Sequence, residues 1–214
     1  HPMKKITFLP SSLVLSVFLV LFSVKVIAEI DHVIDRVYLT GVYTGQIAYG
    51  FPHGIGVYSY YGGDEYIGEF RHNRLHGEGI LNFFNGDRYI GEFSDDKRQG
   101  KGIYTFISGD IYSGGFADNK FNGQGTYIFS TGAQYVGQWK NNKKHGKGIL
   151  NFENGDSYEG EWKNDQRYGK GIYTFANGDV YSGEFRNNKR HGLGFYIFSN
   201  GKKIDDIWED DERL

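Results

Sequence analysis

The amino-acid sequence repeats one pattern at a fixed interval of 23 residues, without insertion or deletion. Each copy begins with a tyrosine, has a glycine two positions later, and contains a Gly-x-Gly sequence further along. Seven copies in register fill residues 43–203. A strict period of this kind indicates stacked copies of one small unit, instead of a globular domain around a single core. The repeated tyrosines are Tyr43, Tyr66, Tyr89, Tyr112, Tyr135, Tyr158 and Tyr181.

Two strand-like segments make up each copy. In one copy these are residues 158–162 and 169–175, which are rich in aromatic and β-branched residues and are bounded by polar turn formers. A second turn, typified by Asn154-Gly155-Asp156, joins one copy to the next, and its Asn-Gly pair favours a type I′ hairpin. We therefore expect an all-β fold, an elongated and twisted single-layer ribbon of antiparallel hairpins with about 14 strands.

Glycines recur at fixed places beside the aromatic residues. Gly160 lies between Tyr158 and Trp162 in sequence, and Gly169 and Gly171 fall in the facing strand. Because glycine weakens a strand, we interpret these glycines as clearance for rings that lie flat on the backbone. The first copy has Ile47 in the aromatic slot four residues after the tyrosine, and the others have Phe70, Phe93, Phe116, Trp139, Trp162 and Phe185.

The N-terminal residues differ in character from the repeats. Lys4 and Lys5 precede an uncharged run over residues 6–24, which is the layout of a secretory signal, with a cleavage site after Ala28. A retained membrane anchor is the competing interpretation, because the run approaches the roughly 20 residues that span a bilayer. Residues 1–28 therefore predict a protein that is secreted or periplasmic, or is anchored in a membrane through residues 4–28.

Both ends of the array carry degenerate sequence. We assign residues 29–42 to an N-terminal cap, with a candidate strand at Val37-Tyr38-Leu39. In residues 204–214 the repeat decays, with Asp206 in the glycine slot and Trp208 in the aromatic slot, and the chain closes on acidic residues. A half-repeat with a charged tail is one way to protect the last edge of a solenoid.

No constellation in the sequence predicts catalysis, a cofactor or a metal. The chain has no cysteine, and its formal charge of −2 does not favour nucleic-acid binding. His53, His76, His145 and His191 share one repeat position, but other copies have Gln99, Asn122 and Tyr168 there, which indicates a structural role. The Gly-x-Gly pairs lack the spacing of a phosphate loop, and the Asn-Gly-Asp turns lack the ligands of a calcium loop.

Basic residues recur in the connection between the two strand-like segments of each copy. If equivalent connections stack, these side chains form a basic ridge on one long edge of the ribbon, and the turn acids lie on the opposite edge. Such a ridge could contact an anionic membrane or a partner, or it could simply keep the edge solvated. The residues are Arg71, Arg74, Lys97, Arg98, Lys120, Lys143, Lys144, Arg167, Lys189 and Arg190.

The repeated rings suggest a further use. An exposed ladder of aromatic side chains at constant spacing could stack on a glycan or on another component of the cell envelope. A glycan-binding module is therefore the alternative to a scaffold that presents its surface to protein partners.

The pattern Tyr-x-Gly-x-(Trp/Phe) followed by Gly-x-Gly at this period resembles the MORN repeat, the membrane occupation and recognition nexus. Residues 135–139 with His145-Gly-Lys-Gly148 match throughout, and the first copy is the poorest match. The resemblance implies an elongated sheet of β-hairpins that serves in scaffolding, dimerisation or attachment near membranes. It implies a stand-alone array that binds unknown protein partners or an anionic membrane surface, with a homodimer as a further expectation and no enzymatic activity.

Overall fold

The computed structural model describes residues 31–214, which contain strands and turns and no helix. The predicted signal or anchor falls in residues 1–28, outside the described part of the chain. Within residues 31–214 no helix offers the length and apolar character that crossing a bilayer requires.

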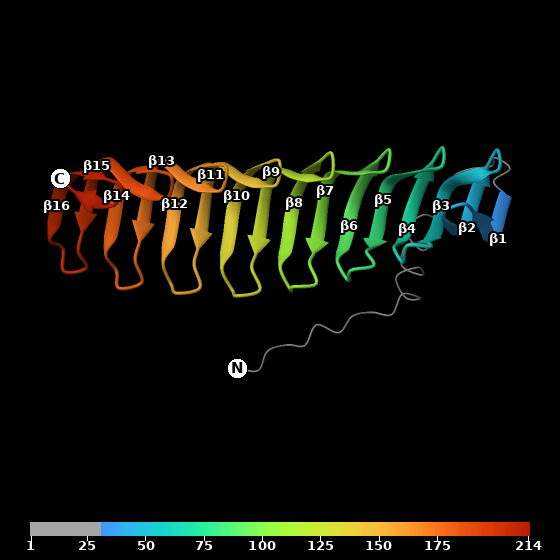
Figure 1. Cartoon of the computed structure of the whole chain (residues 1–214), viewed down its shortest axis with the longest axis horizontal. Coiled ribbons are helices and arrows are strands. Elements are labelled where there is room, and N and C mark those ends of the chain that lie inside the picture. Colours follow the sequence, from blue (N-terminus) through green and yellow to red (C-terminus); the bar gives the residue numbers. More distant parts are fainter. Residues whose placement is uncertain (1–30) are drawn as a thin grey trace, which may run out of the picture. The chain divides into compact units, whose positions relative to one another are not determined.

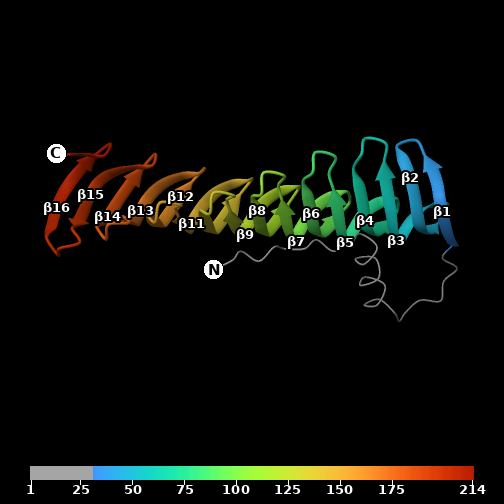
Figure 2. The ribbon, with the colours of Figure 1, turned by 90° about the horizontal axis from the view of Figure 1, so that it is seen from below.

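The described residues form one antiparallel sheet of 17 strands, in which each strand pairs with the next in chain order (Figure 1). Figure 2 shows the strand direction turning gradually along the ribbon, as strand twist produces. The expected count of about 14 strands is wrong, because the strands of the ends were not included: the seven repeats supply β2 to β15, and the ends add β1, β16 and β17. The strands are β1 Asp31–Tyr38, β2 Gly41–Ala48, β3 Phe51–Tyr60, β4 Glu65–Arg71, β5 Arg74–Asn82, β6 Arg88–Ser94, β7 Lys97–Thr105, β8 Ile111–Ala117, β9 Lys120–Ile128, β10 Gln134–Lys140, β11 Lys143–Asn151, β12 Ser157–Lys163, β13 Gln166–Thr174, β14 Val180–Arg186, β15 Lys189–Ile197, β16 Lys203–Glu209 and β17 Glu212–Arg213.

The type I′ turn of each repeat is not at the Asn-Gly pair, as the sequence suggested, but at the other connection. The turn between the two strands of one repeat has two residues, such as Asn187-Asn188, and their φ values of 52° and 70° are typical of a type I′ hairpin. In the Asn-Gly turns only the glycine has a positive φ. Gly86, with φ 92°, donates its N–H to the carbonyl oxygen of Phe83, as in a type I turn closed by a glycine bulge. The prediction of a type I′ turn at Asn-Gly is therefore wrong.

Side chains alternate strictly between the two faces of the sheet. In β4, Tyr66, Gly68 and Phe70 are buried, whereas the residues between them are partly exposed. We call the side with the repeated tyrosines the aromatic face and the opposite side the groove face. The core of the protein is a single layer of rings on the aromatic face.

A column of glycines crosses the sheet from β2 to β15. Gly68 pairs with Gly79 within a repeat and with Gly56 in the preceding one, and the same pairing recurs along the array. A Cβ atom on Gly68 would lie 2.5 Å from the Tyr66 hydroxyl oxygen, which confirms the interpretation of these glycines as clearance for rings. For Gly169, the first glycine of Gly-x-Gly, that interpretation is wrong: its φ is 62°, a Cβ atom there would meet the Glu161 side chain, and it lies at a register shift where the strand bulges.

The ends of the array follow the repeat in part. β16 lies beside β15, with Asp206 opposite Gly194 at the end of the glycine column and with Trp208 buried. β17 has only two residues and pairs with Trp208 and Glu209, so within the described part of the chain residues 203–206 of β16 have no strand partner on that side. At the other end β1 is a full strand of 8 residues, longer than the expected segment, and Leu39 lies in the turn after it.

Aspartates at four of the turns between repeats tie one repeat to the next. The carboxylate of Asp110 accepts hydrogen bonds from the N–H of Ser130 and from the hydroxyl of Tyr127, each at 2.7 Å. These two bonds, the Ser130 N–H first, hold the pKa of Asp110 below its ordinary value. Asp87, Asp156 and Asp179 make the same pair of bonds, and their pKa values are lowered as well.

We expect these four aspartates to make the protein sensitive to acid. Because folding lowers their pKa values, the stability that they contribute is present above the unfolded pKa of about 3.9 and is lost as the pH falls below it and through the lower folded pKa. In urea unfolding, the urea concentration at the midpoint should decrease when the pH is below about 4. In a variant with all four changed to Asn the midpoint should be lower near neutral pH and should vary less with acid. If the midpoint of this variant fell in acid as much as that of the original protein, the four aspartates would not be the source of the acid sensitivity.

Candidate partner-binding surface

The seven repeated tyrosines are fully buried, each with an exposed fraction of 0%. Their hydroxyls donate to the backbone carbonyl three residues ahead, as in Tyr158 to Glu161 at 3.0 Å and Tyr181 to Glu184 at 3.1 Å. Burial raises the pKa of each of them, to about 12 for Tyr181. These tyrosines therefore hold the strands together and are not available to a ligand.

The Phe and Trp side chains of the repeats interleave with the tyrosines. Tyr135 makes edge-to-face contacts with Trp139 at 5.2 Å and with Trp162 of the next repeat at 5.3 Å between ring centroids. The same zigzag runs from Tyr43 to Trp208, and all of its rings are at most 7% exposed. These rings therefore do not form the exposed ladder that glycan binding would require, because they are packed against one another in the single-layer core.

The predicted basic ridge divides into two sets. Arg98, Lys144, Arg167 and Arg190 are half-buried and lie over rings of the aromatic face. Lys144, for example, has its Nζ 4.9 Å from the Trp162 ring, and burial lowers its pKa. These four side chains cover the core with their stems and contribute cation–π contacts.

The other basic residues of the ridge are exposed at the two-residue turns: Arg71, Arg74, Lys97, Lys120, Lys143 and Lys189. Two of them pair with acids of the next turn, Arg74 with Asp95 at 3.7 Å and Lys97 with Asp118 at 2.7 Å. The acids are absent from the turns His72-Asn73, Asn141-Asn142 and Asn187-Asn188, so the positive charge of the edge is greatest at these three turns. We call this side of the sheet the basic edge.

The repeat histidines lie next to the basic edge. His53, His76, His145 and His191 are half-buried, and the Nδ1 atoms of the last three are buried with no hydrogen-bond partner. Within residues 31–214 no three histidine, aspartate or glutamate side chains group as a metal site.

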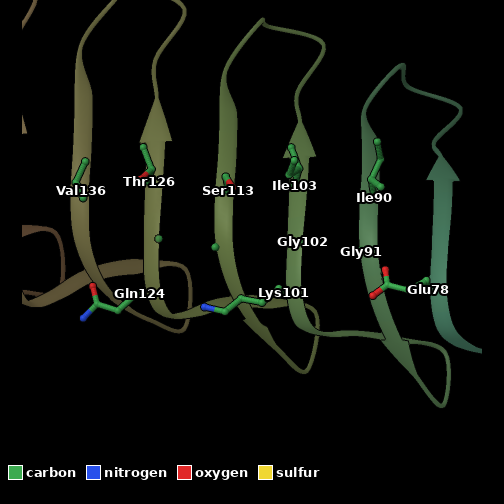
Figure 3. A pocket seen from close by; sticks show the side chains of 12 residues that line it. Glu78, Ile90, Gly91, Lys101, Gly102, Ile103, Ser113, Gln124, Thr126 and Val136 are labelled. Atoms are coloured by element: carbon green, nitrogen blue, oxygen red, sulfur yellow. The ribbon is translucent and has the colours of Figure 1, made fainter. Parts of the chain in front are cut away.

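A groove that sequence reasoning missed runs along the groove face, over the glycine column. It consists of two adjoining cavities of about 580 Å³ and about 1000 Å³, which share Gln124 and Val136. Bare glycine backbone forms its floor, since the rings occupy the other side of the sheet. Figure 3 shows one wall built by a row of Ile90, Ile103, Ser113, Thr126 and Val136, and the other by the longer Glu78, Lys101 and Gln124.

The polar wall of the groove changes along the array. At its start Glu78 faces Glu92 across the strands, and burial, Glu92 and Glu69 raise the pKa of Glu78. In the middle the wall carries opposite charges, with Lys147 facing Glu161. At its far end Leu193 faces Ile207, and both are exposed apolar residues. The groove therefore has an acidic end and an apolar end.

The profile of the MORN repeat matches the chain seven times, over residues 43–65, 66–88, 89–111, 112–134, 135–157, 158–180 and 181–203. No curated protein matches the sequence. Among solved structures, the chain is similar to the TCP domain of SAS-4 (dCPAP) of Drosophila melanogaster in complex with a proline-rich motif of Ana2 (dSTIL). The two are 15% identical over 73% of this chain and 85% of that chain, with a TM-score of 0.46.

The wild-type TCP10 domain of Danio rerio CPAP is 14% identical over 79% of this chain and 90% of that one, with a TM-score of 0.40. At TM-scores below 0.5 neither likeness bears on the function of this chain. The match to the repeat profile is stronger evidence of family membership, because it is contiguous over residues 43–203 and coincides with the observed hairpins. The chain belongs to the MORN repeat family.

Proposed function

We propose that the protein is a non-enzymatic scaffold that binds a protein partner in an extended conformation along the groove. The observation that carries this proposal is the continuity of the groove, which passes over consecutive repeats from Glu78 to Phe195. Its floor of glycine backbone allows close approach of another chain, and its walls alternate apolar and polar side chains that can select one sequence.

The character of the walls specifies the partner further. The acidic end, with Glu78 and Glu92, favours a segment with basic side chains. The apolar end, with Leu193 and Phe195, favours bulky apolar side chains. One repeat occupies two strand spacings, about 9.6 Å, and an extended chain advances about 3.3 Å per residue, so each repeat would contact about three residues of the partner.

The location of this scaffold is part of the proposal. The two lysines and the uncharged run in residues 4–24 support export or membrane anchoring. Partners are accordingly expected outside the cytosol or at a membrane surface.

A photo-reactive residue at Ile172, in the apolar wall, tests the proposal in the native host. We expect it to cross-link one main protein, and we expect Ile149→Arg to abolish the cross-link by placing a long charged side chain in the groove. Ile197→Arg is the matched control, because Ile197 is on the same face, is exposed to 37% against 39% for Ile149, and does not line the groove. Cross-links that survive Ile149→Arg would contradict binding in the groove.

A further inference from the structure

Large apolar side chains are exposed at consecutive turns on the edge opposite the basic edge. Leu39 is 96% exposed, Tyr61 64%, Phe84 79% and Ile107 73%. These values are high enough that none of the four side chains can be counted as core. We call these four residues the apolar edge.

The four residues form one continuous row. The N–H of Tyr61 donates to the carbonyl oxygen of Thr40, beside Leu39, at 3.0 Å. The Phe84 ring leans over Gly63 of the preceding turn, where a Cβ atom would lie 2.6 Å from it, and Ile107 leans over Gly86 in the same way. Successive residues of the row are thus about 10 Å apart, two strand spacings.

Folding does not require apolar residues in this row. The later repeats have Ser130, Glu153, Ala176 and Ser199 at the position of Phe84. The N–H groups of Ser130, Ala176 and Ser199 donate the same turn hydrogen bond to an aspartate of the preceding turn. The turns are therefore stable with small or polar side chains there. Apolar residues in the first turns alone indicate a contact made only at the N-terminal end of the array.

The neighbouring sequence indicates what makes this contact. The uncharged run ends at Val24, and six residues separate it from β1. Six extended residues span at most about 21 Å, so a run that enters a bilayer keeps β1 and the adjacent turns close to the lipid surface. Leu39 follows β1 directly, and the other three residues come from the next three turns on the same edge.

We propose that the apolar edge, Leu39, Tyr61, Phe84 and Ile107, inserts into the interfacial region of a lipid bilayer and lays the N-terminal repeats against the membrane. Aromatic and aliphatic tips on rigid turns suit that depth, where one end of a side chain meets lipid and the backbone stays hydrated. The adjacent carboxylates Asp64, Asp87 and Asp110 oppose a strongly anionic surface. The preferred surface is therefore zwitterionic, and the basic edge faces away from it.

Site-specific labelling of the full chain tests this proposal. Because the protein has no cysteine, a single environment-sensitive label can be placed at Ile107→Cys, and control labels at Ser199→Cys on the same edge and Lys143→Cys on the basic edge. Each labelled protein is bound to phosphatidylcholine vesicles that carry nitroxide quenchers at the headgroup or in the acyl chain. We expect a blue shift and quenching at residue 107 and neither at residues 199 and 143.

A second variant separates a specific contact from the effect of the label. In the chain labelled at residue 107, Tyr61→Ser with Phe84→Ser should abolish the quenching while leaving the thermal midpoint unchanged, since serine occupies the slot of residue 84 in later repeats. The proposal is overturned if no position is quenched, or if residue 143 is quenched instead. Quenching at residue 107 that needs phosphatidylserine and is reversed by salt would also overturn it, because charge and not apolar contact would then hold the protein.

Discussion

Replacing Gly160 by valine is expected to lower the free energy of unfolding by about 3 kcal/mol or more. A Cβ atom at this position would lie 2.5 Å from the hydroxyl oxygen of Tyr158 and 2.6 Å from the Cα of Gly171. Neither can move freely, because the ring is fully buried and Gly171 is in the facing strand. Valine must therefore displace the ring or separate the two strands.

The neighbouring position provides a matched control. Glu159 lies on the groove face, where other repeats have Ile67, Ile90 and Val136, so Glu159→Val should change stability by less than about 0.5 kcal/mol. In thermal unfolding monitored by circular dichroism, we expect Gly160→Val to lower the midpoint by about 6–12 °C and Glu159→Val to leave it near the original value. Equal midpoints for the two variants would contradict the role of the glycine column.

Truncation of a repeat tyrosine is expected to have an effect of similar size. Tyr135→Ala removes a ring that is fully buried and that contacts Trp139 within its repeat and Trp162 in the next. Removing a large buried aromatic side chain costs about 3–5 kcal/mol. Because the ring joins two repeats, the loss should also weaken the coupling between the two halves of the array.

Two further variants separate the contributions of Tyr135. Tyr135→Phe keeps the ring and removes only the hydrogen bond to the carbonyl oxygen of Gln138, so it should cost about 1 kcal/mol. Tyr168→Ala truncates a tyrosine that is 41% exposed and should be nearly neutral. Urea unfolding of the three proteins gives the comparison. A loss for Tyr135→Ala no greater than that for Tyr168→Ala would show that the zigzag of rings does not stabilise the sheet.

The repeat pattern was sufficient to predict the hairpins and the contact between rings and glycines. Period 23 fixes which residues are equivalent, and the alternation in segments such as residues 66–70 fixes which side chains share a face. The turn types were not predictable in the same way. Asn-Gly is a strong type I′ signal, but Asn187-Asn188 reaches positive φ at both residues, and Gly86 forms a bulge that the sequence alone does not distinguish from a turn.

The surfaces were predicted less well than the fold. Adjacent residues of the predicted basic ridge, such as Lys143 and Lys144, differ in exposure because successive strand residues point to opposite faces of the sheet. Applying that alternation to the sequence would have separated the exposed basic residues from the half-buried ones. The burial of Tyr and Trp rings depends on packing between repeats, which a single repeat does not reveal. The groove gave no sequence signal of its own, since its floor consists of glycines already explained by the rings.

Cross-linking from successive repeats tests binding of an extended partner most directly. Photo-reactive residues placed one at a time at Ile103, Ile149, Ile172 and Phe195 occupy equivalent positions in the apolar wall. An extended partner predicts that each site reaches a different segment of one protein, in the order of the array, with about three partner residues per repeat. Cross-links from all four sites to the same short segment, or to unrelated proteins, would contradict it.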